Sequence, residues 1–99
     1  LVLNNGQWGE RFIGIAKALG LADGLDEIKV TWGEAIAEDA LKAKLAATNY
    51  AAVVAVHNES STGTAADLRE IGAAVAETDA ILIVDTVSGL GGMEMRQDD

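Results

Sequence analysis

The sequence predicts an α/β fold of three layers, in which helices cover both faces of a mostly parallel sheet built from βαβ crossovers. Four short apolar runs, at residues 1–3, 28–32, 51–56 and 80–84, begin roughly 25 residues apart, which is the spacing of strand, loop, helix and loop. Helical periodicity fills the connections between these runs. Right-handed crossovers then place all four strands parallel in one sheet.

The first connection predicts a helix. Its apolar side chains recur at the spacing of one helix face, and a glycine follows as a stop signal: Trp8, Phe12, Ile15, Ala16, Leu19 and then Gly20. Trp8 and Trp32 are expected to fill the core or an interface, because large aromatic side chains on an apolar stripe usually do so.

The second run, residues 28–32, alternates apolar and polar residues, which indicates a strand with one wetter face or a place near the sheet edge. The connection that follows is rich in alanine. It predicts a helix over residues 38–47 with a narrow apolar stripe at Leu41 and Leu45.

The third and fourth runs, residues 51–56 and 80–84, are apolar at consecutive positions, as in parallel strands that helices cover on both faces. Helical spacing returns between them at Leu68, Ile71, Gly72, Val75 and Ala76. Thr64, with Asp67 three residues later, resembles a capping box at the start of this helix.

The composition excludes several classes of protein. The 99 residues contain no cysteine, which excludes a disulfide scaffold, a thiolate metal site and a cysteine nucleophile. The net charge of −9 opposes binding to nucleic acid or to an anionic membrane surface. No apolar run approaches the roughly 20 residues that cross a bilayer. We therefore expect a soluble protein with one domain over residues 1–99, no second domain and no metal site.

Two polar segments rich in small residues follow the two most buried predicted strands, at residues 57–63 and 85–92. Because ligands bind at the carboxyl ends of parallel strands, these segments are the candidate site. A phosphate loop at the glycines of the second segment is a weak candidate, since no Lys-Ser/Thr follows them. A hydrolytic triad of His57, Ser60 and Asp85 lacks the Gly-x-Ser-x-Gly pattern.

Two residues in these segments each leave two interpretations open. Asp85, at the end of a buried strand, needs a metal, a cation or a ring nitrogen as partner, or it caps the following turn through backbone N–H groups. Ser60 offers a hydroxyl to a ligand, or it caps the following helix together with Ser61 and Thr62.

Taken together, the segments resemble a known family. Residues 56–63 (VHNESSTG) and 83–92 (IVDTVSGLGG) resemble the cofactor domain of class V pyridoxal-phosphate aminotransferases, above all the serine–glyoxylate and alanine–glyoxylate branch. Residues 5–12 (NGQWGERF) resemble the Asn-Gly-x-aromatic-Gly-x-Arg segment of that branch, and residues 32–34 (WGE) its Trp-Gly pair. The resemblance covers nearly the whole chain in the family's order.

The resemblance implies pyridoxal 5'-phosphate as cofactor and the large domain of a fold-type I enzyme. It implies that Asp85 binds the protonated pyridine nitrogen, that Val87 packs against one ring face, and that Ser60 lies near the phenolic oxygen. Two positions depart from the family pattern. Residues 64–67 (TAAD) stand where an apolar residue and a proline are usual, and Gly89 stands where Ser or Ala is common.

The resemblance further implies an internal segment of a longer, homodimeric and cytoplasmic enzyme. The phosphate cup would precede Leu1 and the Schiff-base lysine would follow Asp99, so the segment holds no catalytic residue and is inactive alone. The parent would move an amino group from serine or alanine to glyoxylate or pyruvate. The alternative is a non-enzymatic α/β ligand-binding or interaction module.

Overall fold

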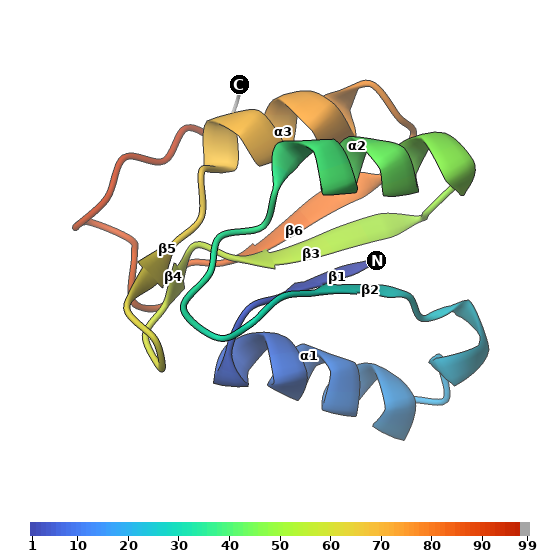
Figure 1. Cartoon of the computed structure of the whole chain (residues 1–99), viewed down its shortest axis with the longest axis horizontal. Helices are drawn as coiled ribbons and strands as arrows, with labels where there is room; N and C mark the ends of the chain where they lie inside the picture. Colours follow the sequence, from blue (N-terminus) through green and yellow to red (C-terminus); the bar gives the residue numbers. More distant parts are fainter. Residues whose placement is uncertain (98–99) are drawn as a thin grey trace.

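The computed structural model describes residues 1–97 and has the three layers that the sequence predicts (Figure 1). One helix covers one face of a four-stranded sheet, and two helices cover the other. The strands lie in the order β2-β1-β3-β6, and every neighbouring pair is parallel. The strands are β1 (Val2–Asn4), β2 (Glu27–Lys29), β3 (Ala52–Val56) and β6 (Ile81–Asp85). The helices are α1 (Gln7–Ala18), α2 (Glu38–Ala47) and α3 (Leu68–Ala76), with a short 3-10 turn η1 (Ala22–Gly24). The prediction of a parallel α/β sheet is confirmed.

Sheet growth reverses direction at β1. The chain reaches β2 through α1 on one side of β1, and it reaches β3 through α2 on the other side. The segments that follow β1 and β3 therefore leave the sheet toward opposite faces. In open α/β sheets this reversal point, at the carboxyl ends of the strands, is where ligands bind.

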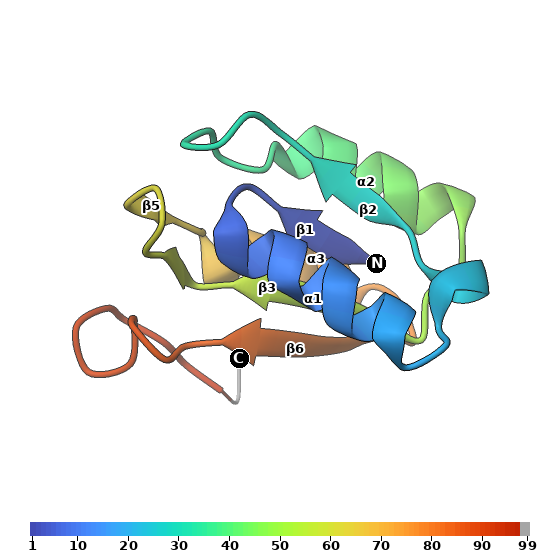
Figure 2. The same cartoon turned by 90° about the horizontal axis from the view of Figure 1, so that it is seen from below.

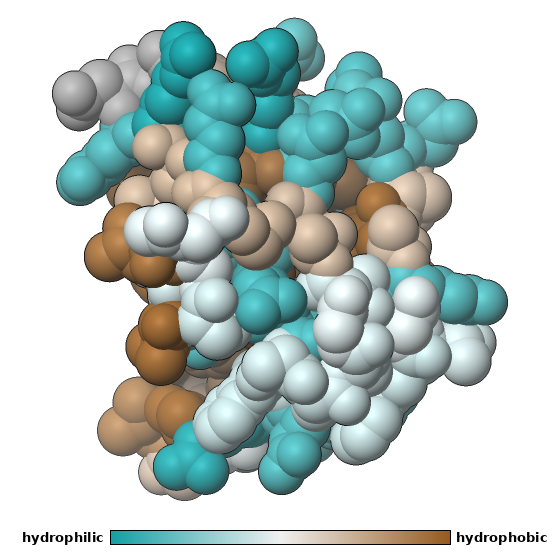
Figure 3. All heavy atoms as spheres, turned by 90° about the vertical axis from the view of Figure 1, so that its left-hand side faces the viewer, coloured by the Kyte–Doolittle hydropathy of each residue, from teal (hydrophilic) through white to brown (hydrophobic). Residues whose placement is uncertain are grey.

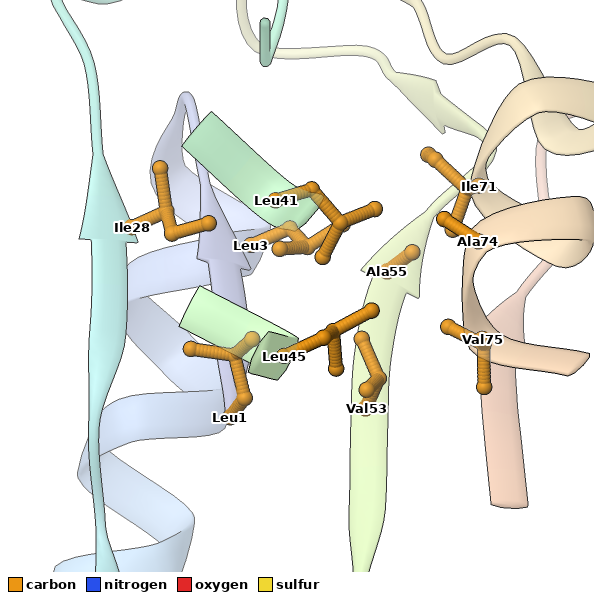
Figure 4. Close-up of a cluster of buried hydrophobic side chains, with 10 residues drawn as sticks. All are labelled: Leu1, Leu3, Ile28, Leu41, Leu45, Val53, Ala55, Ile71, Ala74 and Val75. Carbon is orange, nitrogen blue, oxygen red and sulfur yellow. The ribbon is translucent and has the colours of Figure 1, made fainter. Parts of the chain in front are cut away.

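The main core lies between the sheet and the helix pair α2 and α3 (Figure 4). The stripe predicted at Leu41 and Leu45 points into it, and Leu41 is only 1% exposed. The other buried members come from the strands, from the residue before β1 and from α3: Leu1, Leu3, Ile28, Val53, Ala55, Ile71, Ala74 and Val75. The helix predicted over residues 38–47, which carries Leu41 and Leu45, corresponds to α2. No helix within residues 1–97 combines the length and the apolar character needed to span a membrane.

The edge position predicted for the second strand is confirmed, since β2 is the outermost strand beyond β1. It is shorter than the predicted run and ends at Lys29. One further bond, from the Val30 N–H to the Asn4 carbonyl at 3.1 Å, precedes the turn at Gly33, whose φ of 94° suits glycine.

The prediction that the fourth run is covered on both faces is wrong for β6. Leu82 packs against the core beside α3, but Ile81 is 63% exposed and Ile83 is 43% exposed. Strand alternation places these two side chains on the face opposite Leu82, which is the face on which α1 lies (Figure 2), and their exposure shows that α1 leaves them largely uncovered. In the described chain, β6 is therefore covered on one face only.

The predicted capping box at Thr64 is also wrong. Thr64 lies in a short strand, β5 (Thr64–Ala65), which pairs antiparallel with β4 (Asn58–Glu59). Asp67 is itself the N-cap of α3, and its Oδ1 accepts the N–H groups of Arg69 at 3.0 Å and Glu70 at 3.1 Å.

Asp26 joins the start of β2 to the end of α2. Its carboxylate accepts from Lys44 Nζ at 2.8 and 2.9 Å and from the Tyr50 hydroxyl at 2.6 Å. The hydrogen bond from Lys44, followed by that from Tyr50, lowers the pKa of Asp26 from its ordinary 3.8 to about 2.

Leu41→Ala is expected to lower the free energy of unfolding by about 2–5 kcal/mol, because it leaves a cavity at the centre of the core. Leu19→Ala is the matched control, since Leu19 is 70% exposed, and should change stability by less than about 0.5 kcal/mol. Urea denaturation measures both. Equal effects of the two substitutions would contradict the core described above.

The lowered pKa of Asp26 predicts an acid-sensitive part of the stability. This contribution to the free energy of unfolding is fully present above pH 3.8, the ordinary pKa of Asp26. It is lost as the pH falls through about 2, the lowered pKa. Because Asp26 is 40% exposed, solvent screening limits it to less than about 1 kcal/mol. Asp26→Asn should remove this acid-dependent loss, measured as the unfolding free energy between about pH 5 and pH 2. Asp23→Asn, in exposed η1, should leave the pH profile as it is.

Candidate site at the carboxyl edge of the sheet

The carboxyl ends of the strands carry two segments that pack side by side, residues 57–66 and 85–93. Figure 3 looks onto this end of the molecule, where hydrophobic side chains gather along one flank and neutral or hydrophilic ones cover most of the rest. The first segment is the β4–β5 hairpin, which the sequence did not predict. Its turn closes through bonds from the Thr62 and Gly63 N–H groups to the Glu59 carbonyl at 3.0 and 2.8 Å, with Gly63 at a φ of 73°.

Glu59 is the buried charged group of this edge, with no exposed surface. Its Oε2 accepts the N–H groups of Trp8 at 3.0 Å and Gly9 at 3.2 Å. Its Oε1 accepts the hydroxyl of Ser61 at 2.7 Å and the N–H of Ser61 at 3.4 Å. The carboxylate therefore binds the first turn of α1, where N–H groups lack partners within the helix and the helix dipole favours a negative charge.

Ser61 completes the cap of α1. Its hydroxyl oxygen accepts the Gln7 N–H at 3.0 Å. The N-cap position of α1 is Gly6, which has no side chain of its own to bind the helix. A Cβ at Gly6 would clash with Glu59 Cγ and lie 2.8 Å from Ser61 Oγ, so any other residue there must displace these two side chains. The expectation that the serine run caps the following helix is wrong: it caps α1, about fifty residues earlier in the chain.

Trp8 and Ser60 contact each other across this edge. The indole Nε1 of Trp8 donates to the hydroxyl oxygen of Ser60 at 2.9 Å. Trp8 is 38% exposed, and the guanidinium of Arg11 lies 6.0 Å from the centre of its ring. Trp32 is 52% exposed. Neither tryptophan is buried in the core of the described chain, so of the predicted core or interface positions only the core is wrong. The indole of Trp8 lies beside Ser60.

Asp85 ends β6, and strand alternation places its side chain with those of Ile81 and Ile83, on the face opposite Leu82 and the core. Its Oδ1 accepts the N–H of Val87 at 3.0 Å, so the turn-capping interpretation of Asp85 is confirmed. That bond occupies one of the two carboxylate oxygens, and the other can accept from a donor on a ligand. Val87, whose backbone N–H makes this bond, is 94% exposed, so its apolar side chain is open to a ligand.

Hydrogen bonds hold the two segments together. The N–H of His57 donates to the Asp85 carbonyl at 2.9 Å, in the register that pairs Val56 with Asp85. Asn58 Nδ2 donates to Ser88 Oγ at 3.1 Å, and Ser88 Oγ donates to the Asn58 carbonyl at 3.0 Å. The segments that carry Ser60 and Asp85 are thus fixed relative to each other.

The side chain of His57 packs against the backbone of the second segment at Gly89. It is 2% exposed, and a Cβ at Gly89 would lie 2.8 Å from its Nδ1. The glycine at position 89, where the resembled family commonly has Ser or Ala, therefore leaves room for this imidazole. The Ser60 hydroxyl bonds Trp8, and within residues 1–97 His57 Nδ1 has no hydrogen-bond partner. The contacts do not assemble a triad of His57, Ser60 and Asp85.

The described residues do not form a metal-binding site. Within residues 1–97 no group of three or more His, Asp or Glu side chains converges in a way that could hold a metal ion.

Comparison with known proteins identifies the family. The profile of the class-V aminotransferases matches residues 14–99. An uncharacterized aminotransferase of Methanocaldococcus jannaschii is 47% identical over 95 residues, which cover 92% of this chain and 24% of the relative. The chain belongs to the class-V aminotransferase family.

Two further members show the same relationship. The L-aspartate–glyoxylate aminotransferase of Paracoccus denitrificans is 32% identical over 104 residues, covering 100% of this chain and 26% of the relative. The crystal structure of an alanine–glyoxylate aminotransferase from Nostoc sp. superposes with a TM-score of 0.88 at 31% identity, over 98% of this chain and 25% of that one. The chain thus spans about a quarter of the length of the class-V aminotransferases that it matches.

Membership of the class-V aminotransferases confirms two expectations from the sequence. The α/β architecture is that of the fold-type I aminotransferases, as the superposition shows. The family depends on pyridoxal phosphate, so the expected cofactor is confirmed at the level of the family.

Sequence reasoning missed Glu59 and misplaced Trp8. A signal for Glu59 was present, because an acidic residue lies three positions after a buried strand and the N-cap position of α1, Gly6, has no side chain to cap the helix. The pairing of the two could not be read from the sequence, because they lie about fifty residues apart.

Gly6→Ala is expected to lower the free energy of unfolding by about 1–3 kcal/mol, because the added methyl group displaces the Glu59 side chain from the start of α1. Gly14→Ala is the matched control on the same helix. Nothing lies within 4 Å of a Cβ at Gly14, so this change should stabilise the protein by about 0.5–1 kcal/mol. Urea denaturation of both variants checks the opposite signs.

Proposed function

We propose that this chain is an internal segment, residues 1–99, of the large domain of a pyridoxal-phosphate-dependent aminotransferase. The parent transfers the amino group of a small amino acid, serine or alanine, to a small 2-oxo acid such as glyoxylate or pyruvate. The parent works as a homodimer, and the segment alone is inactive. The observation that carries the proposal is the position of Asp85, fixed by Val56 of β3 and by the Val87 N–H at the carboxyl edge of the sheet.

The residues at this edge fit an aromatic cofactor with a positively charged ring nitrogen. Asp85 offers a carboxylate oxygen to a ring N–H, and Val87 offers an apolar contact beside it. Ser60 offers a hydroxyl, and the indole of Trp8 offers a flat surface for ring stacking. The donor set thus combines a charge-assisted hydrogen bond, a neutral one and two apolar faces, which together suit a pyridinium ring that carries a hydroxyl.

Each of these side chains has a separate task. When bound, the cofactor supplies an electron sink for the bond that breaks at the substrate's α-carbon. The carboxylate of Asp85 keeps the ring nitrogen protonated, because a nearby negative charge favours the charged form. Ser60 orients the ring through its hydroxyl, while Val87 and Trp8 exclude water from the ring faces and fix its plane.

The three site residues are held before any ligand arrives. Ser60 is bonded to Trp8, Asp85 to the backbone of Val87, and the two segments to each other through Asn58 and Ser88. Such preorganisation lowers the entropy cost of binding. It supports a binding role for this edge independently of the family resemblance.

Asp85→Asn is expected to lower the rate of transamination on the order of a hundredfold or more while the fold stays intact, because the carboxamide carries no charge to hold the ring proton. The assay uses the full-length protein that contains this segment, with serine or alanine as donor and glyoxylate as acceptor. Asp79→Asn is the matched control, in the exposed turn before β6, and should leave the rate unchanged.

Two outcomes would contradict the proposal. If the full-length wild-type protein does not alter the visible absorbance of pyridoxal phosphate, it does not bind this cofactor, and the non-enzymatic module becomes the better interpretation. If Asp85→Asn turns over at the wild-type rate, Asp85 has another role than holding the ring proton.

A further inference from the structure

The first turn of α1 takes all of its early hydrogen-bond acceptors from residues 59–61. The Gln7 N–H donates to Ser61 Oγ, and the N–H groups of Trp8 and Gly9 donate to the Glu59 carboxylate. The next N–H, that of Glu10, already bonds to the Gly6 carbonyl within the helix. The three otherwise unpaired N–H groups of α1 are therefore all satisfied from the β4–β5 hairpin.

Trp8 is the residue held twice by this hairpin. Its backbone N–H donates to Glu59, and its indole Nε1 donates to the neighbouring residue, Ser60, at 2.9 Å. Backbone and ring of one residue are thus fixed by two consecutive residues of another segment. The direction of the indole plane depends on where Glu59 places the start of α1.

Of the two hydrogen bonds that hold Trp8, the one to Glu59 is the stronger, because Glu59 is buried. Glu59 has no exposed surface and receives four donors, whereas Ser60 is exposed. A buried carboxylate with several donors is costly to disturb, because removing a donor or acceptor leaves a polar group unpaired away from water. The Gly6 backbone, which allows no Cβ at this point, brings the helix as close to the carboxylate as the contact requires.

We propose that Glu59 is a positioning residue: by binding the first turn of α1 it aims the indole of Trp8 at the ring of the cofactor and keeps it against Ser60. This inference rests on the proposed function for the part that concerns the cofactor. Glu59 touches neither cofactor nor substrate in this role, and it acts through Trp8 alone.

Glu59→Gln tests the proposal with the least change of shape. Both carboxylate oxygens accept N–H groups, so an amide NH2 at either position faces a donor. In the cofactor-free full-length protein, hydrogen–deuterium exchange of the peptide over residues 5–11 should rise about tenfold at the amides of Trp8 and Gly9. Hydroxyl-radical oxidation of the Trp8 side chain should rise about twofold, because the residue is only 38% exposed when it is held. Glu77→Gln, an exposed residue at the end of α3, is the control and should change neither signal.

The cofactor measurement separates positioning from mere stability. Glu59→Gln should weaken the binding of pyridoxal phosphate about tenfold when Trp8 is present and should have no effect in a Trp8→Leu background. An equal loss in both backgrounds would overturn the proposal, because Glu59 would then act by another route. Unchanged oxidation of Trp8 would overturn it as well.

Two further outcomes, a Glu59→Gln variant that does not fold and a wild-type protein that does not bind pyridoxal phosphate, still leave a decisive measurement. If Glu59→Gln does not fold, Ser61→Ala takes its place, since it removes one donor to Glu59 and the acceptor of the Gln7 N–H. The same signals should then rise by a smaller factor, and no rise would overturn the proposal. If the wild-type protein fails to bind pyridoxal phosphate, the proposed function fails, while exchange and oxidation still decide whether Glu59 aims Trp8.

Discussion

The contact between the Glu59 carboxylate and the first turn of α1 is the constraint on which the carboxyl edge of this fold depends. A buried carboxylate needs hydrogen-bond donors, and a helix that starts at Gly6 needs acceptors. Each satisfies the other across about fifty residues of sequence. The contact joins the segment after β1 to the segment after β3 at the point where the sheet reverses its direction of growth. Without this contact, no carboxylate would hold the start of α1, and with it Trp8, against the β4–β5 hairpin.

The sequence contained most of the architecture because the architecture depends on local patterns. The stripe at Leu41 and Leu45 in an alanine-rich segment predicted α2, and the spacing of the apolar runs predicted the four strands of the main sheet. The failures share one cause. The burial of Ile81, the cap attributed to Thr64 and the place of Trp8 all depend on which distant segment packs nearby. Hydropathy gives the faces of an element, but it does not say how far a neighbouring helix reaches.

In the candidate site too, some residues could be predicted from local sequence patterns and others could not. Asp85 could be selected from residue chemistry alone, because a carboxylate at the end of an apolar strand needs a partner. Ser60 and Val87 depended on the family resemblance, since a hydroxyl and an exposed apolar residue are common in loops. The structure adds how they are held: the hairpin fixes Ser60 through Trp8, and the turn after β6 fixes Val87 through Asp85. Binding groups on neighbouring strand ends are thereby supported by bonds that cross between elements.

The pairing of β3 with β6 carries a consequence for how this segment can change in length. Both faces of β6 carry apolar residues, so hydropathy alone would tolerate a shift by one position. Such a shift would turn Asp85 toward α3 and put Val84 in its place. The exposed connection before β6 prevents it: Thr78 binds the Val75 carbonyl and the Ala80 N–H, and Ile81 binds the Ala51 carbonyl. A one-residue insertion or deletion in this solvent-facing turn would therefore act on the site from a distance, by shifting the strand that carries Asp85.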